Sequence, residues 1–143
     1  RQRYRCRHMG MIFQNPGASF DPVRPYGAQF RDTLKSHGRY DARRFAADAE
    51  EALGRLGLTD PCRLLACRPY ELSGGMSRRV AIARALAYGG DALILDEPFK
   101  GLEAELKEHI GKLISEYAQT KPVIIVTHDE YGKSLTKNSV ILS

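Results

Sequence analysis

Two short motifs, about twenty residues apart, constrain this chain more than any other feature. The first, Leu72-Ser73-Gly74-Gly75-Met76, predicts a turn that opens a helix, where free backbone N–H groups and the positive end of the helix dipole attract phosphate. The second is an apolar run, Ala92 to Leu95, typical of a buried strand, which delivers Asp96 and Glu97 at its carboxyl end. One of these acids can hold a metal and the next can act on water. Together the motifs predict half of a nucleotide site.

Five motifs, taken in order, resemble the nucleotide-binding subunit of ATP-binding cassette (ABC) transporters. They are Met11-Ile12-Phe13-Gln14 (similar to the Q-loop strand), Leu72 to Met76 (the family signature), Leu93 to Glu97 (Walker B and its catalytic glutamate), Lys100-Gly101-Leu102-Glu103 (the D-loop) and Val126-Thr127-His128-Asp129 (the switch-histidine loop). The match continues along the helix that follows the signature, over residues 78–86. The resemblance implies an α/β fold of the P-loop NTPase, ABC-cassette type: a parallel sheet with an inserted helical subdomain.

The chain departs from the family pattern in two places. No G-x-x-x-x-G-K-[ST] string, the phosphate-binding P-loop, occurs in the 143 residues. We therefore expect that the N-terminal portion of the cassette is missing and that its loss leaves apolar surface uncovered. We also expect this chain to be inactive as an ATPase when it is alone. The second departure is Glu103, which stands where the D-loop usually has Asp and would have to fold back to make the same contact across a dimer.

The resemblance assigns ATP and Mg²⁺ as cofactors and gives four residues catalytic or metal-binding roles. Asp96 binds Mg²⁺ through water, Glu97 polarises the attacking water, Gln14 meets Mg²⁺ or water with a neutral amide, and His128 donates to a γ-phosphate oxygen. Taken alone, Gln14 is any polar residue that ends a strand, and His128 is more often a capped or core histidine. The family context favours the functional interpretation.

The signature residues Ser73, Gly74, Gly75 and Met76, with Glu103, are expected to bind nucleotide held by a second ABC ATPase subunit, in a homodimer or heterodimer. A simpler interpretation of the Ser-Gly-Gly element is an ordinary helix cap and turn, and both interpretations can hold. Met76 in place of the more usual Gln, and the stretch over residues 11–22, resemble the oligopeptide, dipeptide and nickel importer branch.

By resemblance, the chain is an ATPase subunit peripheral to the cytoplasmic face of the membrane, with permease subunits as further partners. Phe20, Tyr26 and Phe30 would receive a coupling helix of the permease, or form the core of the helical subdomain. A non-hydrolytic partner module, which supplies signature and D-loop to a complete ATPase, is the alternative function. A third possibility, a DNA-repair or translation ATPase, is disfavoured by the importer style of the Q-loop.

Composition adds few constraints. Much of the formal net charge of +5 comes from four arginines among the first seven residues, with no aromatic platform, so no nucleic-acid partner is expected. Three cysteines, Cys6, Cys62 and Cys67, lack a convincing zinc spacing and are predicted to be free thiols. No apolar run approaches the ~20 residues of a membrane helix.

The pattern of apolar residues predicts the order of the elements. We expect strands at 10–14, 92–95 and 123–126, a last short strand at 140–142, and helices at 45–56, after Ser73 and at 103–117. Strand, helix, strand implies a parallel crossover. Residues 1–14 and 90–143 are assigned to a partial RecA-like catalytic core, and 15–89 to the helical signature subdomain. His8, His37 and His109 are expected to be solvated.

Overall fold

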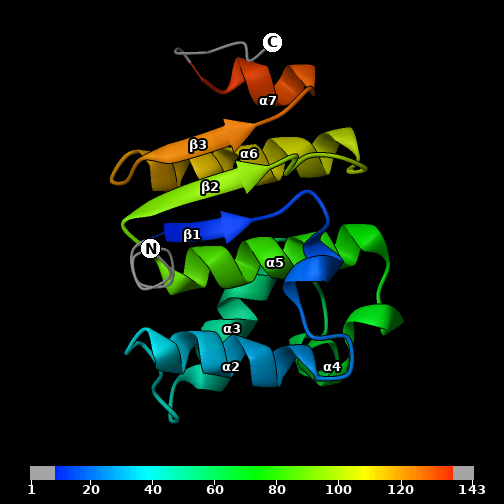
Figure 1. The fold of residues 1–143 in the computed structure, drawn as a ribbon, viewed down its shortest axis with the longest axis vertical. Helices are drawn as coiled ribbons and strands as arrows, with labels where there is room; N and C mark the ends of the chain where they lie inside the picture. Colours follow the sequence, from blue (N-terminus) through cyan, green and yellow to red (C-terminus); the bar gives the residue numbers. More distant parts are fainter. Residues whose placement is uncertain (1–8, 137–143) are drawn as a thin grey trace.

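A three-stranded parallel sheet organises the chain in the computed structural model, which describes residues 9–136. The strands are β1 (Met9–Ile12), β2 (Ala92–Asp96) and β3 (Val123–Val126), with β2 in the centre (Figure 1). Ile12 pairs with Leu95, and Asp96 pairs with Val126. The predicted parallel arrangement is confirmed, and the carboxyl ends of all three strands therefore meet at one edge.

The helices follow the predicted order, with additional short elements. They are α2 (Tyr26–Ser36), α3 (Phe45–Gly54), α4 (Pro61–Ala66), α5 (Gly74–Tyr88), α6 (Ala104–Ala118) and α7 (Glu130–Ser134), with 3₁₀ turns η1 (Pro16–Ser19) and η2 (Pro69–Glu71). Three predicted helices are confirmed with small shifts at their ends, whereas β1 ends two residues earlier than expected because Asn15-Pro16 turns the chain. The strand predicted at 140–142 lies outside the described residues.

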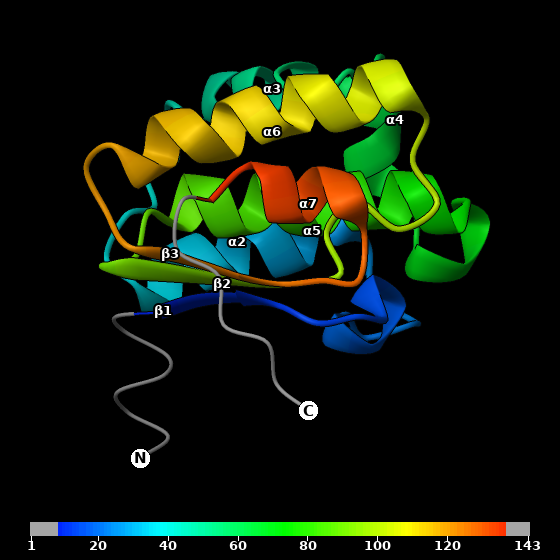
Figure 2. The same ribbon diagram turned by 90° about the horizontal axis from the view of Figure 1, so that it is seen from above.

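Among the described residues, helices α3, α5, α6 and α7 lie on one side of the sheet, as Figure 2 shows. The buried side of the strands carries Ile12, Leu93 and Leu95, whereas Met11, Phe13, Ile124 and Val126 are exposed large apolar side chains on or next to β1 and β3. The expected uncovered apolar surface is therefore present in the described part of the chain. Within residues 9–136, no helix is both long and apolar enough to cross a membrane.

The aromatic residues that follow β1 belong to the core. Phe20 and Tyr26 are buried with their rings edge to face at 4.7 Å, and Phe30 is buried beside them in the same cluster. The Tyr26 hydroxyl also donates to Ser77 Oγ of α5 at 3.0 Å. The alternative that these rings are core residues is confirmed, and the alternative that they receive a coupling helix is wrong, because their burial removes them from the surface.

Helix α5 joins the helical layer to the sheet. Its N-cap is Ser73, whose Oγ accepts from the Met76 N–H at 3.3 Å, as the sequence predicts, and Gly89 ends it with φ of 59°. A side chain in place of Gly10 would put its Cβ 3.1 Å from Leu93 and 3.5 Å from the Ala85 carbonyl oxygen of α5. Glycine thus permits β1 to lie close to this helix. The division into a catalytic core and a helical subdomain stays a prediction.

The histidine predictions have mixed outcomes. His37 is half-buried with its ring 3.7 Å from that of Tyr88, so the prediction of a solvated side chain is wrong; the turn after α2 brings it onto the end of α5. His109 is exposed and contacts the Arg55 carbonyl, and His8 lies outside the described residues. Of the cysteines, Cys62 and Cys67 are free thiols, as predicted, and Cys6 lies outside the described range.

Two phenylalanines test the assignment of the core. Phe30→Ala should lower the free energy of unfolding by about 3–5 kcal/mol, because Phe30 is only 1% exposed and truncation leaves a cavity. Phe13→Ala is the matched control: Phe13 is 47% exposed, and its loss should cost less than about 1 kcal/mol. Urea denaturation followed by circular dichroism measures both, and equal losses would show that the core is misassigned.

Candidate functional site

Glu97 is the first residue after β2 and takes an unusual backbone conformation. Its φ of 50° lies in the left-handed region, which a side chain other than glycine rarely adopts. Its N–H donates to the Val126 carbonyl at 2.8 Å, which extends the pairing of β2 with β3, and only 7% of the residue is exposed. Such strain persists where the surroundings hold it and is frequent at functional sites.

The Glu97 carboxylate binds the loop after β3. Oε1 accepts from the His128 N–H at 2.9 Å, and Oε2 accepts from the Thr127 hydroxyl at 3.2 Å. The structure therefore brings together Glu97 and His128, two residues that the sequence placed on one sheet edge. Each carboxylate oxygen keeps further lone pairs that can accept from a water molecule.

Thr127 and Lys107, to which the sequence assigns no role of their own, fix this loop. Thr127 Oγ1 also accepts from the Asp129 N–H at 3.0 Å, and Lys107 of α6 forms an ion pair with Asp129 at 2.5 Å. Asp129 Oδ1 caps α7 by accepting from two of its N–H groups. The hydrogen bond from Lys107 lowers the pKa of the Asp129 carboxyl, and the capping N–H groups add to this.

The His128 side chain itself is exposed. Asp129-Glu130, shortly after the apolar strand β3, is a helix N-cap signal that the sequence shows. Nothing in the sequence indicates that Lys107 pairs with Asp129.

Gln14 and Asp96 lie at the same sheet edge as Glu97. The Gln14 side chain is exposed, Asp96 is half-buried at the end of β2, and neither side chain makes a hydrogen bond or ion pair within the described residues. No cluster of three or more potential ligands occurs among residues 9–136. Mg²⁺ needs only one or two protein oxygens when phosphates and water complete its coordination. A carboxylate and an amide without protein partners fit that role.

The signature glycines have no packing reason to be glycines. A Cβ at Gly74 would meet nothing within 4 Å, and one at Gly75 would meet only Leu102 at 3.9 Å. Glycine inside a helix costs roughly 0.5–1 kcal/mol relative to alanine. Their first-turn N–H groups also have no partner in the helical ladder. The arrangement suits the close approach of an outside anion to the N-terminus of α5, beside the exposed Ser73.

The signature and the end of β1 line one cavity of about 630 Å³. Gln14, Gly74, Gly75 and Arg78 contribute to its wall, with Lys100 and Gly101 of the loop after β2. Glu103 does not line it: this residue is exposed at the N-cap of α6, and its carboxylate makes no capping hydrogen bond. Met76 is half-buried and packs against the core, so its side chain serves the fold.

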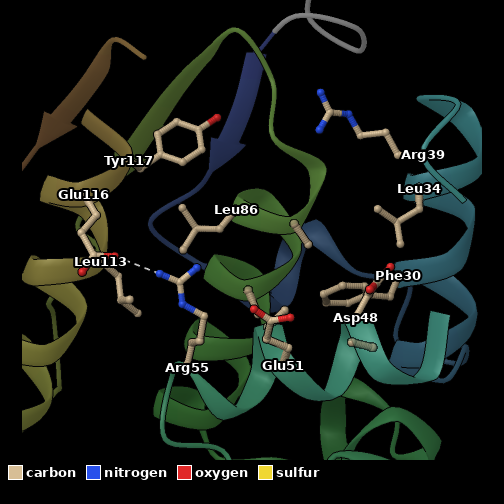
Figure 3. Close-up of a pocket in the computed structure, with 14 residues that line it drawn as sticks. Phe30, Leu34, Arg39, Asp48, Glu51, Arg55, Leu86, Leu113, Glu116 and Tyr117 are labelled. Carbon is tan, nitrogen blue, oxygen red and sulfur yellow. Dashed lines mark hydrogen bonds and ion pairs between the residues drawn. The ribbon is translucent and has the colours of Figure 1, made fainter. Parts of the chain in front are cut away.

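A second cavity, of about 680 Å³, lies between α2, α3, α5 and α6 (Figure 3). Arg55, the C-cap residue of α3, and Glu116 of α6 form an ion pair at 2.9 Å on its wall, and Phe30 and Leu34 supply apolar surface. None of the predicted site residues lines this cavity. The candidate chemistry is therefore confined to the sheet edge and the start of α5.

Comparison with known families places the chain. The family model described as "ABC transporter" matches residues 1–100, and the chain belongs to this family. The fold is that of an ABC cassette: the dimeric ATP-binding cassette MJ0796, in a structure bound to ADP and Pi, superimposes with a TM-score of 0.80 and 27% identity. That match covers 94% of this chain and 58% of the other.

Curated relatives include ATP-binding proteins of bacterial importers. The oligopeptide transport protein OppD of Lactococcus lactis is 37% identical over 85% of this chain and 36% of its own length. The nickel import protein NikD of Rhodospirillum rubrum is 39% identical over 86% of this chain and 48% of its own. The resemblance expected from the motifs is confirmed, and the chain spans between a third and a half of these relatives.

The ion pair that holds the loop after β3 predicts a pH-dependent contribution to stability. Asp129→Asn keeps a capping oxygen for α7 but loses the charge, so it should cost about 1 kcal/mol of unfolding free energy at pH 7. Because the pKa of Asp129 is lowered in the fold, this difference is complete above the ordinary value of 3.8 and disappears as the pH falls through the lowered value.

Urea titrations of both proteins between pH 7 and pH 2.5 measure the difference. Asp48→Asn is the control, because its ion pair with Arg44 is more exposed, and it should change stability by less than Asp129→Asn. A cost of Asp129→Asn that does not shrink at low pH would contradict the assigned ion pair.

Proposed function

We propose that this chain acts in the ATP-binding subunit of an ABC importer, where ATP binding and hydrolysis drive uptake of peptides or nickel. The observation that carries the proposal is the pairing at the sheet edge: Glu97, strained and buried, accepts hydrogen bonds from the loop that carries His128. The relatives named for oligopeptide and nickel transport support the substrate classes.

Different residues of this chain would carry out different parts of ATP hydrolysis. Glu97 orients the attacking water, because a buried carboxylate already fixed by the Thr127 hydroxyl and the His128 N–H needs little reorganisation when it accepts a further hydrogen bond. The exposed His128 imidazole is placed to donate to a γ-phosphate oxygen. When bound, Mg²⁺ neutralises phosphate charge, and Asp96 and Gln14 are the residues that would hold it.

The signature serves a second subunit. Ser73 and Gly74 are exposed and Gly75 is half-buried at the positive end of α5, so this turn is available to nucleotide that another chain holds. The MJ0796 cassette is dimeric, which supports this arrangement. Glu103, exposed beside α6, would reach toward the partner in place of the usual aspartate.

The proposal places the subunit at the cytoplasmic face of the membrane, against permease subunits, with no nucleic-acid partner. Residues 1–14 and 90–143 would form the partial catalytic core and 15–89 the helical signature subdomain. The alternative is a partner module that lends its signature and D-loop to a complete ATPase without hydrolysis. Glu97 favours the enzyme, since a module that never hydrolyses ATP has no use for a strained carboxylate beside the histidine loop.

The enzyme interpretation is tested in a chimera in which residues 1–143 replace the matching segment of the Lactococcus oligopeptide subunit. Glu97→Gln should retain ATP binding and lower kcat at least about 100-fold, because the amide keeps the shape but loses the base. The matched control, Glu105→Gln, changes an exposed carboxylate in the first turn of α6 and should leave kcat unchanged. Turnover at the parental rate by Glu97→Gln would remove Glu97 from the chemical step.

A further prediction concerns the 143-residue chain alone. Because its sequence contains no P-loop string, most phosphate contacts are lacking, and calorimetry should find no micromolar affinity for ATP with Mg²⁺. Micromolar binding by this chain would show that the nucleotide is held by residues outside the predicted site.

A further inference from the structure

Arg78 connects three segments of the candidate site with one side chain. It lies on α5, five residues after Ser73, and is only 9% exposed. Its Nη2 donates to the Gln14 carbonyl at 3.0 Å, and its Nη1 donates to the Lys100 carbonyl. The guanidinium thus bridges the segment after β1 to the loop after β2, from the helix that begins at the signature.

This placement has an electrostatic cost that the chain does not offset with an ion pair. Within the described residues, no carboxylate forms a salt bridge with Arg78, and its Nε is buried without a partner. Burial lowers the pKa of the guanidinium, whereas the negative charge of Glu97 raises it. Burying a charged group that is bonded only to carbonyl oxygens costs free energy. A side chain kept there despite this cost suggests that holding the two loops has a function.

The segment after Gln14 is attached to α5 at further points. Tyr26 donates to Ser77, and Arg84 donates to the Ser19 carbonyl at 3.3 Å while its guanidinium stacks 4.0 Å from the Phe20 ring centre. Burial lowers the pKa of Arg84 to about 10. Residues 14–26 are therefore held against α5, and Arg78 extends that attachment to the loop after β2.

We propose that Arg78 is a positioning residue that locks the Gln14 carbonyl and the Lys100 carbonyl to the signature helix, so that the three nucleotide-facing segments keep one relative arrangement. Gly101, with φ of 74°, lets the loop turn so that the Lys100 carbonyl faces the guanidinium. The consequence for turnover rests on the proposed function, whereas the lock itself does not.

Arg79 provides a matched control on the same helix. It donates to the carbonyls of Leu56 and Gly57 at 3.4 and 3.2 Å, and burial likewise lowers the pKa of its guanidinium. Its hydrogen bonds therefore hold the turn after α3 and do not go to either loop of the site. Substitutions at 78 and 79 remove the same kind of side chain from the same helix but release different segments.

Hydrogen–deuterium exchange of the 143-residue chain tests the lock without nucleotide. Arg78→Gln should speed exchange of the amides at 14–18 and 100–103 about tenfold or more, because two charge-assisted hydrogen bonds are lost. Arg79→Gln should instead speed exchange at 56–58. Arg78→Lys should give intermediate protection, because an ammonium on a flexible stem does not reproduce the planar fork. Unchanged exchange at 14–18 and 100–103 in Arg78→Gln, or the same changes in Arg79→Gln, would overturn the proposal.

The chimera adds a readout that separates positioning from folding. Arg78→Gln should lower kcat at least about tenfold with little change in KM for ATP, because misplaced loops affect the chemical step more than binding. Arg79→Gln should leave both unchanged. Altered exchange with an inactive parental chimera would contradict the proposed ATPase and leave the lock standing. Unaltered exchange would refute the lock whatever the ATPase does.

Discussion

The parallel pairing of β2 with β1 and β3 is the constraint on which every candidate functional position depends. Because Ile12 lies opposite Leu95, and Asp96 opposite Val126, the residues that follow the three strands emerge at one edge. Gln14, Glu97 and His128 each come two residues after one of these paired positions. A slip of one residue in either pairing would send the strand's apolar side chains to the wrong face, so burial of Leu93 and Leu95 fixes the site as well as the core.

Polar contacts then convert this shared edge into a defined arrangement. Glu97 holds the loop after β3 through its carboxylate, Lys107 and Asp129 hold the far side of that loop, and Arg78 holds the loop after β2. Each contact joins residues far apart in sequence, and each ends on a backbone group or a charge. The strained φ of Glu97 is affordable because its N–H and carboxylate are both bonded to the neighbouring segment.

The sequence predicted those parts of the chain whose signal is local. The strand at 92–95 and the helix that Ser73 caps follow from an apolar run and a cap residue, and the structure has both, with β2 one residue longer. The burial of Phe30 and the half-buried position of His37 depend on which helices pack together, which the local pattern does not contain. The bond from Arg78 to two loops is likewise a tertiary feature, since an arginine on a helix looks the same whether it faces solvent or a carbonyl.

The family motifs predict more of the candidate site than periodicity does, because they indicate that Glu97 and His128 act at one site. Their proposed roles depend on a nucleotide held partly by another chain, which a single chain does not display. The glycines at 74 and 75, where an added Cβ would meet nothing closer than Leu102 at 3.9 Å, are the residues that we expect to face that nucleotide.

The most direct test is a crystal structure of the Glu97→Gln chimera with ATP and Mg²⁺. We expect a dimer in which Ser73 Oγ of one subunit lies within hydrogen-bond distance, about 3 Å, of the γ-phosphate held by the other subunit's P-loop. Gln14 and residue 97 should lie beside the nucleotide of their own subunit. A structure in which ATP is bound while Ser73 only caps α5, with no phosphate near Gly74 and Gly75, would show that the signature does not bind nucleotide of the partner subunit.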